Sequence, residues 1–278
     1  MNTQTRIHRL IKQGGIRELC KGILRYIYWH SNLRTARYAI GYKLSGSPVS
    51  KTIGDTSVSF HVSNSKEFAR TKTVYGEHNV IFDVLETLSG DDVFYDVGAN
   101  IGTYTCFVGN KVNPGNTIAF EPHPGNVRRL KENLDMNKIE AEIYSVALSN
   151  EHGSRELSVA GTNNGAGGGT HTLSTDENSK TININVIEGD RLIKNGKIDP
   201  PSVIKIDVEG AEQLVLEGLT NTLKTECRVV YCEVHPDRLN QFGSSEKELK
   251  KLLRSLGYSL QIIEDRSPEY FIKAVRNK

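Results

Sequence analysis

One stretch, residues 93–102, constrains the fold of this chain more than any other. It reads Val-Phe-Tyr-Asp-Val-Gly-Ala-Asn-Ile-Gly, an apolar run that ends around Asp96 and passes into Gly98, Asn100 and Gly102. A strand that turns through glycines into a helix is typical of nucleotide-binding sheets, because the missing Cβ atoms let a ligand approach the backbone and the helix begins with free amide groups. The motif therefore predicts a ligand at these four residues. A larger side chain at Gly98 is expected to block that ligand and to spare the fold if the backbone angles there are ordinary.

A second acid follows at the spacing expected for a ribose. Residues 117–121, Thr-Ile-Ala-Phe-Glu, read as a short strand that ends in Glu121, and an acid in this place can hold two ribose hydroxyls. The spacing of Gly98 and Gly102 departs from the Gly-x-Gly-x-x-Gly of dinucleotide sites, and the carboxylate of Asp96 disfavours phosphate and suits an ammonium group. Taken alone, the glycine motif is also compatible with a tight turn that binds nothing, but Glu121 favours a ligand.

From Thr73 onward, helical and strand patterns alternate. Strands are expected over residues 93–97, 117–121, 142–146, 203–207, 229–234, 258–263 and 270–275, and helices over residues 80–88, 104–109, 126–137, 211–224 and 246–256. This alternation predicts an α/β fold with a doubly wound, mostly parallel sheet. Residues 156–159 and 182–186 alternate like an inserted hairpin, and the glycine-rich run 161–169 between them favours a substrate-side lid over a passive linker. We therefore expect one domain over residues 73–278, preceded by a basic, helical extension over residues 1–72.

Two further motifs complete a resemblance to a known family. Ser145-Val-Ala-Leu-Ser149 and Ile204-Lys-Ile-Asp-Val-Glu-Gly-Ala-Glu212 follow the first two motifs in the order typical of FkbM-type methyltransferases, over about residues 74–275. The resemblance implies a class I, Rossmann-like methyltransferase fold, S-adenosylmethionine as the cofactor and, usually, O-methylation of a sugar or polyketide hydroxyl. The cofactor would then have its amino group at Asp96, its ribose at Glu121, and its adenine beside the backbone of Val146 and Ala147.

The acceptor side of the site is expected at the carboxyl ends of later strands, where Asp207, Glu233 and His235 stand. Methyl transfer to a hydroxyl needs an oxygen that loses its proton as the bond forms, so a general base is useful. His235 suits that role because its pKa lies near neutrality, and Asp207 is the competing candidate. The three side chains could instead hold a divalent cation, which only their predicted proximity supports. The alternative for His235 is an exposed loop residue before Pro236.

Two other polar residues near Asp207 have structural interpretations. Lys205 lies two residues before Asp207 and so shares its face of the strand. A lysine inside a central strand normally needs a partner, so we expect an ion pair with Asp207 or Asp96 rather than catalysis. Glu209 is expected to cap the helix that follows.

Composition is compatible with one globular catalytic domain. The chain has 278 residues, of which 37% are hydrophobic and 24% charged, enough for a substantial core. Its four cysteines form no Cys-x-x-Cys pair and no zinc-type spacing with histidine, so they read as buried thiols in a reducing compartment. Arg25 interrupts the apolar residues near the N-terminus, and no run of eighteen apolar residues occurs, so we expect neither an export signal nor a membrane span and favour a cytoplasmic protein.

The N-terminal extension is strongly basic. Residues 1–43 hold nine Lys or Arg and one acid, Glu18, a net charge of +8 that leaves −6 for the rest of the chain. Apolar residues from Ile16 to Ile27 recur at helical spacing, which predicts a basic amphipathic helix. This helix could dock on the catalytic domain, or it could attach residues 1–45 to the anionic inner face of a membrane. Nucleic-acid binding is not expected, because no reading module accompanies the basic face.

These observations favour an S-adenosylmethionine-dependent O-methyltransferase that acts on a hydroxyl of a sugar, a glycan or a related polyol, which could be lipid-linked. The runner-up enzyme is an NAD-linked or nucleotide-sugar oxidoreductase, which the missing third glycine disfavours. A non-catalytic, cofactor-binding scaffold subunit is the alternative from another class, and the acids at the strand ends argue against it.

Overall fold

A seven-stranded sheet forms the centre of the computed structural model, which describes residues 32–159, 171–173 and 181–277. The strand order is β12-β13-β11-β10-β3-β4-β5, and β13 alone runs antiparallel to its neighbours. The bounds are β3 Phe94–Val97, β4 Thr117–Phe120, β5 Glu142–Tyr144, β10 Val203–Ile206, β11 Val229–Val234, β12 Tyr258–Asp265 and β13 Tyr270–Arg276. The expected doubly wound, mostly parallel sheet is confirmed.

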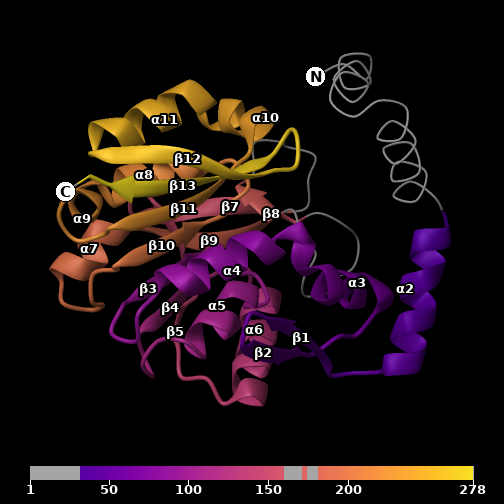
Figure 1. The fold of residues 1–278 in the computed structure, drawn as a ribbon. Helices are drawn as coiled ribbons and strands as arrows, with labels where there is room; N and C mark the ends of the chain where they lie inside the picture. The colour runs from indigo at the N-terminus through magenta and orange to yellow at the C-terminus, as the bar shows by residue number, and fades with distance from the viewer. Residues whose placement is uncertain (1–31, 160–170, 174–180, 278) are drawn as a thin grey trace, which may run out of the picture.

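Helices cover both faces of this sheet (Figure 1). On one face lie α4 His78–Thr87, α5 Thr103–Gly109 and α6 Pro124–Asn137, and on the other lie α7 Gly189–Lys194, α8 Glu212–Gly218, α9 Thr220–Thr225, α10 Pro236–Leu239 and α11 Glu246–Ser255. The single helix expected over residues 211–224 is wrong, because the chain bends at Leu219, which leaves the helical region at φ −119° and ψ 16°. The bend follows Gly218, whose Cα lies against the Ser149 carbonyl.

The register of the central strands decides which side chains meet below the ligand edge. Asp96 on β3 stands beside Lys205 on β10, and the two strands are parallel neighbours. Side chains at directly paired positions project to the same face of a sheet. Asp96 and Lys205 therefore both point towards the face covered by α5.

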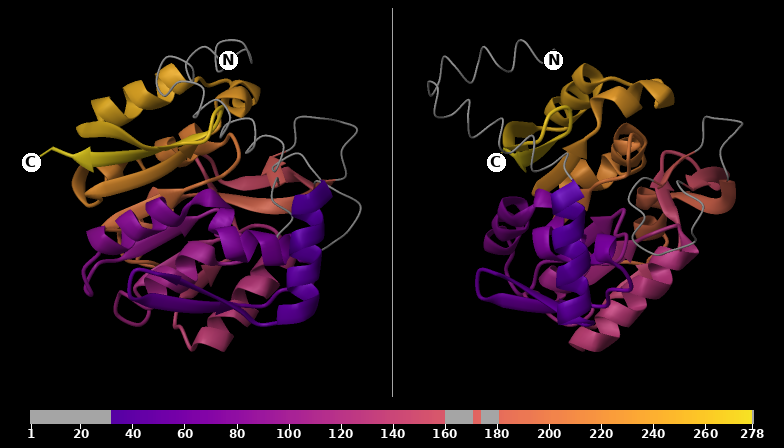
Figure 2. Two further views of the ribbon diagram at one scale, coloured as in Figure 1. Left: turned by 45° about the vertical axis from the view of Figure 1, so that its right-hand side comes forward. Right: turned by 90° about the vertical axis from the view of Figure 1, so that its right-hand side faces the viewer.

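A second, four-stranded sheet lies beside the central one (Figure 2). It consists of β6 Ala147–Ser149, β7 Gly153–Val159, β8 His171–Leu173 and β9 Thr181–Glu188, and β7 pairs antiparallel with β9 as the hairpin pattern predicts. The strand expected over residues 142–146 is confirmed as β5, but its expected end is wrong, because β5 ends at Tyr144 and the chain enters the second sheet as β6. The glycine-rich run 161–169 lies outside the described residues.

The described part of the N-terminal extension is more than helical. It holds α2 Asn32–Ser45, an unexpected hairpin of β1 Val49–Ile53 and β2 Thr56–Phe60, and all but the last residue of α3 Ser65–Thr73. The short 3-10 helix η1 Val74–Gly76 follows the extension. Ile53, Val58 and Phe60 pack in the same core as α4, α5 and α6. The amphipathic stretch from Ile16 to Ile27 lies outside the described residues. Across residues 32–159, 171–173 and 181–277, no helix combines the length and the apolar character required to cross a bilayer.

Candidate active site

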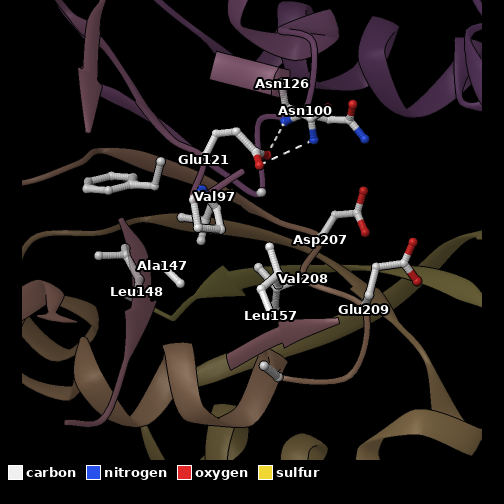
Figure 3. A pocket seen from close by; sticks show the side chains of 14 residues that line it. Val97, Asn100, Glu121, Asn126, Ala147, Leu148, Leu157, Asp207, Val208 and Glu209 are labelled. Atoms are coloured by element: carbon white, nitrogen blue, oxygen red, sulfur yellow. Dashed lines mark hydrogen bonds between the residues drawn. The ribbon is translucent and has the colours of Figure 1, made fainter. Parts of the chain in front are cut away.

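A cavity opens beyond the carboxyl ends of β3, β4 and β10, where the strand order reverses between β3 and β10 (Figure 3). In open α/β sheets this switch point is where ligands bind. One part of the cavity is polar, with Glu121, Asn100 and Asn126 joined by hydrogen bonds, and Asp207 and Glu209 lie on the same side as Asn100. Apolar side chains line the rest of the cavity, namely Val97, Ala147, Leu148, Leu157 and Val208.

The loop from β3 to α5 needs its glycines for the fold itself. Gly98 has φ +77° and Gly102 has φ +86°, both in the left-handed region. A Cβ on Gly98 would stand 1.9 Å from the carbonyl oxygen of Asp207, and one on Gly102 would stand 2.3 Å from Leu130 Cδ1. The backbone angles at Gly98 are therefore not ordinary, and the condition under which a larger side chain there was expected to spare the fold is not met.

Glu121 is held at the polar end of the cavity, directly after β4. Its Oε2 accepts from the Asn100 backbone N–H at 2.8 Å, and its Oε1 accepts from the His123 N–H at 2.8 Å and from Asn126 Nδ2 at 3.3 Å. Burial raises the pKa of Glu121, and these hydrogen bonds oppose that shift. A carboxylate has about four lone-pair positions, so two hydroxyls of a ligand could be added to these three donors only if the donors shift.

Asp96 lies beneath the cavity rather than on its wall. Its Oδ2 accepts from the Thr105 backbone N–H at 3.0 Å and from the Thr105 hydroxyl at 2.6 Å, while Oδ1 lies 3.1 Å from Lys205 Nζ. The expected ion pair of Lys205 is thus confirmed. Because the side chain of Asp96 is fully buried, contact with a ligand's amino group would require these bonds to rearrange. Gly102 and Val146 also lie off the cavity wall, whereas Ala147 lies on it.

A second cavity adjoins the first and shares Gly98, Asn100, Asp207 and Glu209 with it. Its wall includes Glu233 and His235, and one oxygen or nitrogen each from Asp207, Glu233 and His235 lies within 4.8 Å of the others. Lys205 also reaches this point, with Nζ 3.7 Å from Asp207 Oδ2 and a hydrogen bond to the Gly98 carbonyl at 2.9 Å. The structure therefore brings the three predicted acceptor-side residues together at the boundary of the two cavities.

His235 is buried and oriented, which contradicts the alternative of an exposed loop residue. Only 3% of its surface is exposed. Its Nδ1 lies 2.6 Å from Glu212 Oε1, and its Nε2 lies 3.9 Å from Asp207 Oδ1 and 3.3 Å from Glu209 Oε2. Burial alone would lower the pKa of His235, but the hydrogen bond with Glu212 and the charge of Asp207 raise it to about 9.

Sequence reasoning missed Glu212 and misassigned Glu209. Glu212 is fully buried, and its Oε1 also accepts from the Gly210 N–H at 2.8 Å, so it fixes both the loop and the imidazole. Glu209 does not cap α8, whose N-cap is Ala211 without a side-chain bond. A backbone φ of +57° turns Glu209 towards His235 and into an ion pair with Arg238. The second glutamate of the Asp-Val-Glu-Gly-Ala-Glu motif was the signal for Glu212.

Two acids of the second cavity share one arginine. Arg266, in the turn between β12 and β13, pairs with Glu233 and lies 3.3 Å from Glu77 Oε1. Burial and the charge of Asp207 nevertheless raise the pKa of Glu233 to about 9, whereas the pKa of Asp207 is lowered: burial would raise it, but Lys205 and His235 outweigh that effect. Two carboxylates and an imidazole are also donors that suit a divalent cation, so the residues at this point fit such an ion.

Comparison with known proteins identifies the family. Residues 96–260 match the methyltransferase FkbM domain. The chain belongs to the FkbM methyltransferase family. It is 35% identical over 226 residues to the hexuronic acid methyltransferase AglP of Haloferax volcanii, covering 81% of this chain and 88% of that protein. It is 26% identical over 201 residues to the 31-O-demethyl-FK506 methyltransferase FkbM of Streptomyces tacrolimicus, covering 63% and 75% of the two chains.

Membership of the FkbM family makes this chain an S-adenosylmethionine-dependent methyltransferase with a class I fold. The oxidoreductase and the non-catalytic scaffold are thereby set aside. Among solved structures, methyltransferase FkbM from Methylobacillus flagellatus aligns with a TM-score of 0.47 at 14% identity, over 76% of this chain and 53% of that one. The family assignment rests on the sequence matches alone.

Proposed function

We propose that this methyltransferase transfers the methyl group of S-adenosylmethionine to a hydroxyl of a sugar, a glycan or a related polyol. One observation carries the proposal: the two cavities meet at Asp207, so a cofactor in the first and an acceptor in the second would face each other there. The similarity to a hexuronic acid methyltransferase over most of both chains supports a sugar as the acceptor.

In the first cavity, the proposed cofactor site begins with Glu121 and Asn100. Glu121 would accept hydrogen bonds from the two ribose hydroxyls, and Gly98 would let the cofactor approach the backbone. Ala147, Leu148 and Leu157 offer an apolar surface to the adenine. Asp96, Gly102 and Val146 would support this site from behind the cavity wall. Asp96 would do so through its hydrogen bond with Thr105 and its ion pair with Lys205.

In the second cavity, the proposed catalytic residues are Asp207, His235 and Glu233. As the acceptor oxygen bonds to the methyl carbon, the carbon–sulfur bond breaks, S-adenosylhomocysteine leaves, and the hydroxyl proton passes to a base. Asp207 is ionised at neutral pH, whereas His235 can accept a proton only after losing its own. Glu212 positions the imidazole of His235 towards Asp207.

A divalent cation is an optional part of this proposal. When bound by Asp207, Glu233 and His235, it would acidify the acceptor hydroxyl. Arg266 competes for Glu233 in its absence. We further propose that residues 1–45 bring the enzyme to an anionic membrane, where a lipid-linked sugar would be presented.

Incubation of the purified protein with S-adenosylmethionine and a panel of mono- and oligosaccharides tests the proposed function. Mass spectrometry should detect one added methyl group on a sugar, together with S-adenosylhomocysteine. Mild alkali then identifies the acceptor oxygen, since a methyl ether on a hydroxyl resists it and a methyl ester on a carboxylate does not. An alkali-labile product would contradict the hydroxyl acceptor, and transfer to no sugar in the panel would contradict the sugar.

A further inference from the structure

The wall of the second cavity that faces Asp207 comes from segments on either side of the matched family domain. Arg70 at the end of α3, Tyr75 in η1 and Glu77 precede residue 96, and Arg266 and Glu269 follow residue 260. Arg266 joins the two segments, because its Nη1 donates to the Tyr75 carbonyl at 2.9 Å and lies 3.3 Å from Glu77. This wall is therefore the part of the cavity that the matched family domain does not supply.

The charges on the wall leave one cation available. Glu77 and Glu233 pair with Arg266, Asp207 lies beside Lys205, and Glu209 pairs with Arg238. Within the described part of the chain, Arg70 has no carboxylate at ion-pair distance, and Glu269 on the same wall does not reach it. Its guanidinium instead lies over the ring of Tyr75, 5.2 Å from the ring centroid. A guanidinium has five N–H groups, so an arginine beside a single tyrosine keeps most of them for a ligand.

Tyr75 beside it is held in a strained conformation. Val74 and Tyr75 have φ +43° and φ +58°, a region that side chains with a Cβ rarely adopt, least of all a β-branched one. Such strain persists only where the surroundings impose it, and it clusters at ligand sites. Here the hydrogen bond from Arg266 fixes the loop. The Tyr75 hydroxyl is buried, and the neighbouring Arg70 guanidinium is the one side chain of the described residues that interacts with it. Its O–H is therefore left to donate to an accepting group of a ligand.

We propose that Arg70 and Tyr75 form a subsite for a carboxylate of the acceptor, which makes the preferred acceptor an acidic sugar. The planar guanidinium matches a carboxylate in a two-bond geometry, and the tyrosine hydroxyl adds a third donor. The subsite rests on the proposed sugar methylation, and it agrees with the hexuronic acid named for the Haloferax relative. A carboxylate bound there leaves the hydroxyls of the same sugar ring free to face Asp207.

Paired acceptors test this subsite in the full-length enzyme. A phenyl glucuronide and the matched phenyl glucoside differ only in the carboxylate, so the ratio of their kcat/KM values reports its recognition. The wild-type enzyme should prefer the glucuronide, and Arg70→Ala should reduce that ratio about tenfold or more, since a charge-assisted pair is lost. Arg70→Lys should retain part of the preference, and Tyr75→Phe should reduce it by less than Arg70→Ala. Lys72→Ala, on the same helix but off the cavity wall, is the control.

Calorimetry of the S-adenosylhomocysteine complex with glucuronate measures the subsite without turnover. Weaker glucuronate binding in Arg70→Ala, with unchanged thermal stability and S-adenosylhomocysteine affinity, would support the subsite even if neither sugar is methylated, in which case the proposed function alone fails. Equal losses for glucuronide and glucoside, or a wild-type enzyme that binds both alike, would overturn the subsite while the proposed function stands.

Discussion

At the scale of single residues, Glu121 has the sharpest expected role. Glu121→Ala should weaken the binding of S-adenosylhomocysteine by about 1.5 to 3 kcal/mol, because two charge-assisted hydrogen bonds to the ribose disappear. Isothermal titration calorimetry measures the change, and Glu226→Ala, an exposed acid away from the cavity, is the control. An unchanged dissociation constant would remove Glu121 from the cofactor site.

Gly98 tests whether a motif glycine serves the ligand or the fold. Gly98→Ala should lower the thermal midpoint, since its Cβ would collide with the carbonyl of Asp207 and its φ of +77° strains any side chain, at about 1 to 3 kcal/mol for the strain alone. Gly115 has a similar φ of +83° and open space around it, so Gly115→Ala isolates the strain from the collision. Equal shifts in the two variants would show that the collision is relieved at little cost.

The pH dependence of turnover distinguishes the two candidate bases. The pKa of His235 is raised to about 9, so its imidazole is protonated at neutral pH, and a rate that depends on it as the base must rise with pH until about 9. Glu212→Gln removes the charge that helps to raise this pKa, so the rise should move to lower pH. A kcat that stays flat from pH 7 to 9 would instead assign the base to Asp207, which is already ionised.

At the scale of elements, the sequence predicted which side chains meet at the strand ends, but not which atoms each of them contacts. Asp207 follows β10, Glu233 lies near the end of β11 and His235 follows it, so neighbouring parallel strands had to bring the three together. The same reasoning put Asp96 at the ligand edge, but the register of β3 and β10 sets Lys205 beside it. A register between strands is a tertiary property, and the spacing within one strand does not encode it.

The predicted ends of helices and strands were wrong where packing between elements determines them. The break between β5 and β6 moves the chain from one sheet to another, and the bend at Leu219 follows a contact between Gly218 and Ser149. The break after Tyr144 has no proline or glycine to signal it, whereas Gly218 inside the helical pattern was a local signal of the bend. The hairpin of β1 and β2 did have a sequence signal, because Val58 and Phe60 alternate with serines after the Gly54-Asp55 turn. The extension was nevertheless predicted to be helical, from the basic, amphipathic pattern of its first residues.

The strand-end cluster also carries the test of catalysis. His235→Ala and Asp207→Asn should each lower kcat by about 10² to 10⁴ if that residue supplies the base, with little change in S-adenosylhomocysteine affinity. Full activity in both variants would contradict the assignment of the base to either residue. Dialysis against EDTA, followed by addition of Mg²⁺ or Mn²⁺, decides whether the cluster works through a cation, since activity that survives the chelator leaves proton transfer to the side chains alone.

At the scale of the whole molecule, the cavity proposed for the cofactor lies within the family domain, and the flanking segments contribute to the wall proposed for the acceptor. The N-terminal segment packs on the sheet through a hydrophobic core that β1 and β2 share with α4, α5 and α6. Arg266, in the turn between β12 and β13, also donates a hydrogen bond to this segment at the Tyr75 carbonyl. The motifs within residues 96–260 therefore predicted the family, whereas Arg70 and Tyr75, which we propose bind the acceptor's carboxylate, come from a segment without a recognisable motif.

The last prediction concerns attachment to a membrane through the N-terminal region. Residues 1–45 should bind anionic bilayers, because each well-placed Lys or Arg near such a surface contributes about 1 kcal/mol. On α2, Ile40 and Leu44 lie one turn apart and are 58% and 82% exposed, so they can add apolar contact.

The enzyme should co-sediment with liposomes that contain phosphatidylglycerol, and high salt should release it. The double variant Ile40→Ser with Leu44→Ser should bind more weakly than Ile262→Ser, which removes an apolar side chain exposed to a similar degree on β12. If the protein stays in the supernatant in every lipid and salt condition, and deletion of residues 1–31 collapses thermal stability, the segment belongs to the fold and the membrane proposal fails.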